Sequence, residues 1–209
     1  MVKRAIVIAI SVILALAVAA PIASGQTASQ PQDLKALSGE WWTWAISKPS
    51  PLDGDYKQGR RCKGEFVEGV FFLAGTTGGD ATRTCTVPAD TALFFPVLNS
   101  FITDDEDAYP EGPTNFVDTA LANGEFSATL DGEDLEIIRI ATGPFTLTVP
   151  KPNIFKAPPG PYTAVSDGLW VYLPQGLEPG EYTLQFGGTS VTAEGEPFSL
   201  DVTYNLKVV

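Results

Sequence analysis

FSLDVTYNLKVV, residues 198–209, places a large apolar side chain at nearly every second position. Because successive side chains of a β-strand point to opposite faces, a period of two predicts a strand with one buried face and one exposed face. Residues 179–188 (PGEYTLQFGG) repeat this pattern between a Pro-Gly turn and a Gly-Gly pair. We therefore expect the last part of the chain to be a train of β-strands.

Short apolar or alternating runs bounded by turn residues continue through most of the preceding chain, as is typical of strands. Strands are expected over residues 66–74, 83–87, 92–98, 145–149 and 168–173, with a hairpin over residues 126–140 that turns at Asp131-Gly132. Pro96 lacks the N–H group that a central strand uses for pairing. It is therefore predicted to lie at a strand end or at a β-bulge.

Helical spacing of apolar residues occurs in two segments, residues 33–47 and 114–123. Gly39 weakens the middle of the first segment, so we expect a break near Ser38, with Ser38 capping a second short helix. Many alternating strands with one or two short helices predict a mainly β fold. The expected architecture is a two-sheet antiparallel β-sandwich of jelly-roll or immunoglobulin-like type, and a partly closed barrel is the nearest alternative.

The N-terminus has the three-part pattern of a secretory signal peptide over residues 1–25. Lys3 and Arg4 are followed by a long apolar run, and Ala23-Ser24-Gly25 offers small residues for cleavage. Residues 26–32 are then a flexible leader and residues 33–209 a single domain. This predicts a secreted, periplasmic or cell-surface protein. The alternative is a membrane tether, because the uncleaved apolar run of about 18 residues could span a bilayer.

The sequence contains two cysteines, Cys62 and Cys85. In an exported chain an even count indicates a disulfide, which would stabilise the fold by roughly 3 kcal/mol. The alternative is a pair of free thiols in a reducing compartment. Two cysteines without histidine do not make a zinc site of the usual kind.

Charge and composition exclude several function classes. The formal net charge is −12, which disfavours nucleic acid and anionic membranes as partners. The chain has no histidine, so it contains neither a Ser-His-Asp triad nor a histidine metal site. Catalysis would have to rest on carboxylates, Lys, Tyr or a metal, and we expect a non-enzymatic protein more than an enzyme.

One acidic run could bind a cation. Asp104-Asp105-Glu106-Asp107 supplies several carboxylates on one loop, and calcium prefers oxygen ligands of this kind. The spacing is not that of an EF-hand. Calcium is therefore the candidate cofactor, and a solvated acidic turn without a metal is the alternative interpretation.

Three tryptophans lie close together in the first helical segment. Trp41 and Trp44 fall on its apolar stripe and are expected to anchor the core. Trp42 lies off this stripe and is expected to face outward. An exposed tryptophan can stack on a sugar ring, which makes Trp42 the candidate ligand-binding residue.

Several sequence blocks resemble those of a group of uncharacterised exported prokaryotic proteins. The blocks are WWTWA (41–45), VFFLAGT (70–76), RTCTVPA (83–89), ALFFPVLN (92–99), DGLWVYLP (167–174) and PGEYTLQFGG (179–188). The resemblance spans most of the chain after residue 25 and implies an exported protein. It implies no particular activity.

These observations favour a non-catalytic binding or cell-surface module. A carbohydrate-active enzyme or lectin-like module is one alternative, and it would use acidic residues such as Asp53, Asp55, Asp105 and Glu106. A calcium-dependent adhesive or assembly module that uses the acidic run is the other. The sequence does not identify a partner, and the candidates are a carbohydrate or a cell-surface protein.

Overall fold

The computed structural model describes residues 33–46, 61–151, 153, 157–192 and 195–209. The predicted signal peptide, the leader, Asp53 and Asp55 lie outside the described residues. In the part that is described, no helix is long and apolar enough to cross a membrane.

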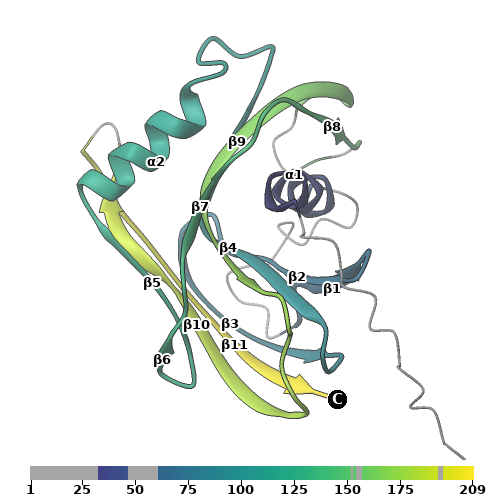
Figure 1. Ribbon diagram of the computed structural model, residues 1–209. Coiled ribbons are helices and arrows are strands. Elements are labelled where there is room, and N and C mark those ends of the chain that lie inside the picture. Colours follow the sequence, from purple (N-terminus) through teal and green to yellow (C-terminus); the bar gives the residue numbers. More distant parts are fainter. Residues whose placement is uncertain (1–32, 47–60, 152, 154–156, 193–194) are drawn as a thin grey trace, which may run out of the picture. The chain divides into compact units, whose positions relative to one another are not determined.

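Two sheets pack face to face, which confirms the predicted mainly β sandwich (Figure 1). The six-stranded sheet runs in the order β1 (Gly64–Val67), β2 (Val70–Leu73), β4 (Ala92–Thr103), β9 (Gly160–Leu173) and β7 (Ile138–Ala141), and β8 (Phe145–Val149) also pairs with β9. The five-stranded sheet runs in the order β3 (Gly79–Val87), β11 (Pro197–Val208), β10 (Gly180–Val191), β5 (Glu125–Leu130) and β6 (Glu133–Asp134).

The expectation of a purely antiparallel sandwich is wrong, because β2 pairs with β4 and β3 pairs with β11 in parallel. The chain leaves the six-stranded sheet after β2, forms β3 in the other sheet and then returns as β4 beside β2. A return through the opposite sheet brings the two strands into the same direction. Residue periodicity carries no information about that crossing.

The main hydrophobic core lies between the sheets, and a second core lies between the six-stranded sheet and helix α1 (Leu34–Ala45). As predicted, alternate residues of β11 from Leu200 to Val208 are buried. The middle strands β4 and β9 are buried on both faces, because the sandwich covers one face and α1 covers the other (Figure 1). On β9, Leu169 and Val171 enter the main core while Trp170 enters the second core.

Helix α1 is continuous, so the predicted break near Ser38 is wrong. Asp33 caps its start, because Asp33 Oδ1 accepts hydrogen bonds from the backbone N–H groups of Lys35 and Ala36. Ser38 donates to the carbonyl of Lys35 inside the helix rather than capping a new one. A Cβ atom at Gly39 would lie 3.2 Å from the ring of Phe145, so glycine lets the helix pack closely on β8.

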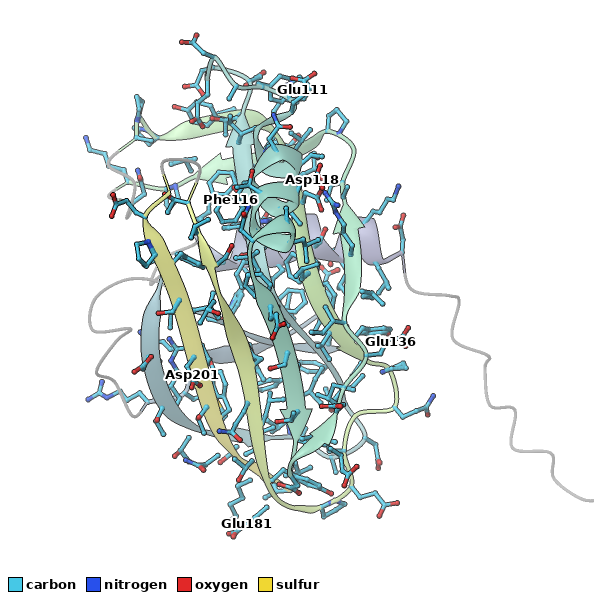
Figure 2. The ribbon with its side chains drawn as sticks, turned by 90° about the vertical axis from the view of Figure 1, so that its left-hand side faces the viewer. Glu111, Phe116, Asp118, Glu136, Glu181 and Asp201 are labelled. Atoms are coloured by element: carbon cyan, nitrogen blue, oxygen red, sulfur yellow. A yellow bond between two sulfur atoms is a disulfide. The ribbon has the colours of Figure 1, made fainter. Side chains whose placement is uncertain are left out.

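The second predicted helix is confirmed as α2 (Gly112–Ala122), with Pro113 in its first turn. Val117 and Ala120 are buried in the main core. Figure 2 shows Phe116 and Asp118 on different sides of this helix.

Two strand predictions need correction. The single strand predicted over residues 66–74 is instead part of the hairpin β1–β2 over residues 64–73, which turns at Glu68 and Gly69, both with positive φ. The turn at Asp131 and Gly132 is confirmed, with φ of 51° and 87°, but its return strand β6 covers only two residues. The chain then crosses to the other sheet as β7, because Ile138 and Ile140 pack against the second core.

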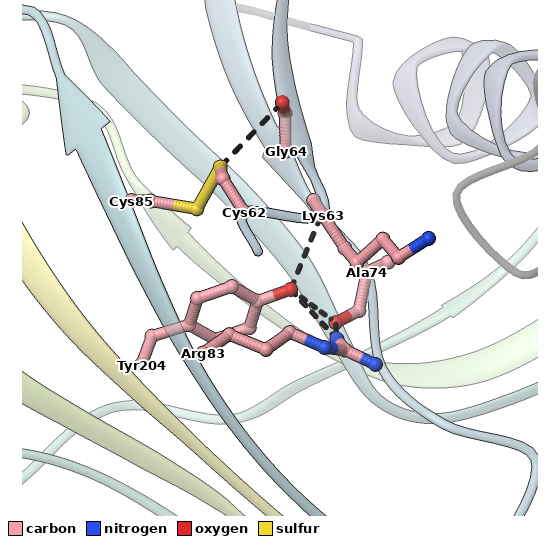
Figure 3. The surroundings of a disulfide bond; sticks show 7 residues. All are labelled: Cys62, Lys63, Gly64, Ala74, Arg83, Cys85 and Tyr204. Atoms are coloured by element: carbon pink, nitrogen blue, oxygen red, sulfur yellow. Dashed lines mark hydrogen bonds between the residues drawn. A yellow bond between two sulfur atoms is a disulfide. The ribbon is translucent and has the colours of Figure 1, made fainter. Parts of the chain in front are cut away.

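The predicted disulfide is confirmed: Cys62 and Cys85 are bonded, with their Cα atoms 4.6 Å apart (Figure 3). The bond joins the segment before β1 to β3 and so ties the two sheets together. Disulfides persist in oxidising compartments, so this bond is consistent with a protein outside the reducing cytosol.

Beside the disulfide, a fully buried Arg83 donates to the carbonyls of Ala74 and Gly75 and to the hydroxyl of Tyr204 (Figure 3). Burial raises the pKa of Tyr204 to about 12. This cluster occupies the point where β2 leaves one sheet to become β3 in the other.

Candidate functional site

A pocket lies beside β4 at the point where this strand is no longer paired with β2. Strand β2 pairs with β4 only as far as Phe94, and the chain then turns toward the other sheet. Just beyond, the register between β4 and β9 shifts between Pro96 and Leu98, which confirms the bulge predicted at Pro96. Bulges bend a strand and change the direction of its side chains, and they are frequent next to functional sites.

The cavity has a volume of about 190 Å³, and we call it the bulge pocket. Its walls come from both helices, both sheets and the turn after β2. The described residues that line it are Trp41 and Trp42 of α1, Phe116 of α2, Gly75, Thr76 and Thr77 of the turn, Pro96–Asn99 of β4, and Phe198 and Leu200 of β11. The pocket is thus mostly aromatic and aliphatic, as ligand sites commonly are.

Two polar groups of the pocket are buried without a partner. Neither Trp42 Nε1 nor Asn99 Nδ2 has a hydrogen-bond acceptor among the described residues. Leaving a buried donor unsatisfied costs about 1–3 kcal/mol, so native proteins seldom retain such groups without a reason. Both groups are donors, and both belong to residues that line the bulge pocket.

The prediction that Trp42 faces outward is wrong, because this side chain is only 6% exposed. Its ring lies 4.5 Å from that of Phe101 on β4 and 5.1 Å from that of Trp41. The six-stranded sheet curves around α1 (Figure 1), so it contacts more of the helix than a single stripe. Stacking of a sugar on an exposed Trp42 face is thereby excluded, but Trp42 remains a candidate ligand-binding residue through its N–H group.

The back of the site depends on Gly168 of β9, which pairs with Asn99. A Cβ atom at this position would lie 2.7 Å from both Asn99 Cβ and Trp170 Nε1. Trp170 Nε1 and Ser166 Oγ are further buried polar atoms without a partner in the described part of the chain. Since Ser166, Gly168 and Trp170 alternate along β9, they share the face that α1 covers.

The acidic run lies at the end of β4, apart from the residues that line the bulge pocket. Thr103 Oγ1 donates to carboxylate oxygens of Asp105 and Glu106, at 2.5 and 3.1 Å. Asp104 Oδ1 accepts from the backbone N–H of Thr163. Within the described ranges, no three His, Cys, Asp or Glu side chains gather as a metal site. The calcium site at Asp104–Asp107 stays a prediction.

Two other pairs of carboxylates share surface hollows, and sequence reasoning missed both. Glu40 and Glu68 line a groove beside α1, where burial and the charge of Glu68 raise the pKa of Glu40. Asp80 and Asp201 are direct partners on β3 and β11 and line a hollow above the outer face of the five-stranded sheet. Packing of α1 beside the β1–β2 turn brings Glu40 and Glu68 together, and the pairing of β3 with β11 brings Asp80 and Asp201 together.

No protein-family model, curated protein or solved structure matches this chain.

Proposed function

We propose that this chain is an exported, non-catalytic binding module, and that the bulge pocket is its ligand site. The observation that carries the proposal is the pair of buried N–H donors, Trp42 Nε1 and Asn99 Nδ2, in an aromatic pocket. The signal-peptide pattern and the disulfide support export.

The chemistry of the pocket supports binding rather than catalysis. Its described lining residues are of the types Trp, Gly, Thr, Pro, Val, Leu, Asn and Phe, and none of these has a side chain that titrates in water. General acid–base catalysis needs a group that exchanges a proton near the working pH. A site made of fixed donors and apolar walls can bind and orient a ligand without changing it.

Rigid supports favour a preformed site. Trp42 is held by its ring contacts with Trp41 and Phe101, and Asn99 lies on a strand that pairs with β9. A ligand that enters such a site loses little affinity to the ordering of side chains. The framework of the pocket is therefore expected to stay in place, while small side-chain shifts expose the two buried donor nitrogens to the ligand.

Nuclear magnetic resonance of the ¹⁵N-labelled protein tests this proposal. The probes are cyclohexanone, methylenecyclohexane, benzoate, glucose and N-acetylglucosamine, each titrated to millimolar concentration. At least one probe is expected to shift the Trp42 indole and Asn99 carboxamide signals in a saturable way. The proposal fails if no probe shifts these signals, or if saturable shifts map only to other surfaces.

A further inference from the structure

We infer that the bulge pocket selects a neutral carbonyl group carried on a small apolar body, with the carbonyl oxygen accepting from Trp42 Nε1 and Asn99 Nδ2. This inference rests on the proposed binding function and adds the chemical class of the ligand. It follows from the donors, the walls and the charge around the pocket.

The donors select an acceptor. Trp42 is nine-tenths buried, and its indole nitrogen can only donate. Asn99 Nδ2 can also only donate, and it lies buried on β4 at the same pocket. A carbonyl oxygen accepts two hydrogen bonds and brings no proton that would need a partner of its own. One carbonyl oxygen can therefore accept one hydrogen bond from each of the two donors.

The walls select an apolar body of limited size. Rings of Trp41, Phe116 and Phe198 line the cavity of about 190 Å³. For comparison, an engineered apolar cavity of about 150 Å³ binds benzene. A six-membered ring or a short branched chain with one carbonyl group thus fits both the volume and the lining.

The surrounding charge disfavours an anion. The described residues that line the pocket include no Lys or Arg, and the chain has a formal net charge of −12. Figure 2 labels Glu111 and Asp118 at the start and in the middle of α2, the helix that carries Phe116. A carboxylate would lose its hydration without meeting a cation, which is unfavourable, whereas a ketone or amide loses much less.

The test compares two probes of nearly equal shape, cyclohexanone and methylenecyclohexane, in which C=O is replaced by C=CH₂. Two hydrogen bonds of ordinary net strength correspond to a preference of roughly tenfold or more. We expect cyclohexanone to bind at least tenfold more tightly than methylenecyclohexane and more tightly than benzoate, with affinities taken from the signal shifts. Benzoate tests the requirement for a neutral ligand.

Variants distinguish the contribution of the two donors to probe affinity from the contribution of the apolar walls. Asn99→Leu removes one donor at similar side-chain size and is expected to reduce the preference for cyclohexanone at least threefold. Trp42→Phe removes the other donor and should act in the same direction. Phe116→Leu is the matched control, because it changes an apolar wall that is 38% exposed and should weaken both probes equally.

Each outcome has one meaning. Equal binding of both probes at the pocket, or tighter binding of benzoate, overturns this inference and leaves the binding function intact. If no probe binds at the pocket, the proposed function itself fails. The comparison of probes on the unaltered protein is decisive even where a variant does not fold, and circular dichroism identifies such a variant.

Discussion

Arg139 on β7 binds the buried carboxylate of Asp167 on β9, with Arg139 Nη2 2.7 Å from Asp167 Oδ2 and Arg139 Nε 3.1 Å from Oδ1. Helix α2 joins the same network: Thr114 Oγ1 donates to Asp167, and Asp118 forms a second ion pair with Arg139. The hydrogen bond with Asp167 raises the pKa of Arg139. The network fixes α2, and with it the Phe116 wall of the bulge pocket, against the six-stranded sheet.

Arg139→Met should lower the free energy of unfolding by about 3 kcal/mol, because it leaves the carboxylate of Asp167 buried without its partner. Urea unfolding followed by tryptophan fluorescence measures the change. Asp118→Asn is the matched control, since the Asp118 side chain is 58% exposed and an exposed ion pair contributes less than about 1 kcal/mol. Equal decreases in the free energy of unfolding of the two variants would contradict the central role of Asp167.

Reduction of the Cys62–Cys85 bond should lower the free energy of unfolding by about 3 kcal/mol, because the crosslink restricts the unfolded chain. Thermal melting with and without reductant measures this loss as a lower melting temperature. The Cys62→Ala/Cys85→Ala double variant should melt near the reduced protein and show no further effect of reductant. An unchanged melting curve of the native protein in reductant would refute a stabilising role.

Alkaline pH should destabilise the domain through Tyr204. The unfolded phenol has a pKa near 10.0, and burial raises the pKa of the folded one to about 12. Below the unfolded value both states are protonated and the stabilisation is fully present. As the pH rises from about 10 to about 12, only the unfolded state loses its proton, and the free energy of unfolding falls by up to about 3 kcal/mol.

Tyr204→Phe provides the control for this pH dependence. It should be less stable at neutral pH by about 1–3 kcal/mol, since Arg83 loses the hydroxyl to which it donates. Its loss of stability between pH 10 and 12 should, however, be smaller than that of the native protein. Denaturant midpoints measured across this range would contradict the assignment if both proteins lost stability equally.

Gly168→Ala should destabilise the domain by about 1–3 kcal/mol, because the added Cβ would meet Asn99 and Trp170 at 2.7 Å in a packed region. Gly75→Ala is the matched control at the wall of the same pocket. Its Cβ would lie 3.7 Å from the carbonyl oxygen of Pro96, which is an ordinary contact. We expect melting temperatures to fall for the first variant only; a comparable fall for both would contradict the difference in packing.

Of the two interpretations of the acidic run, the solvated turn predicts that calcium raises the melting temperature no more than sodium chloride of equal ionic strength. The carboxylates of Asp105 and Glu106 already accept hydrogen bonds from Thr103, and Asp104 accepts one from Thr163. Differential scanning fluorimetry with both salts measures the effect. A larger rise with calcium that disappears in Asp105→Asn/Glu106→Gln would instead establish the calcium site at the acidic run.

Asn99 shows why the candidate site was only partly predictable. The proline at position 96 predicted a strand end or a bulge, because a residue without an N–H group interrupts pairing. Asn99, three residues later, has no local signal that separates it from any polar residue near a strand end. Its role becomes visible only when Gly168 brings β9 close and α1 places Trp42 at the same pocket.

Local periodicity by itself determined the β-rich class, the two helices and the alternating burial of β10 and β11, because neighbouring residues encode which side faces the core. The Asp-Gly pair by itself determined the turn at Asp131-Gly132. Tertiary structure alone decided that β2 and β3 belong to different sheets and that Trp42 is buried. It alone also brought Arg139 to Asp167. These features depend on contacts between residues far apart in the chain, and such contacts form only when the two sheets and the helices pack together.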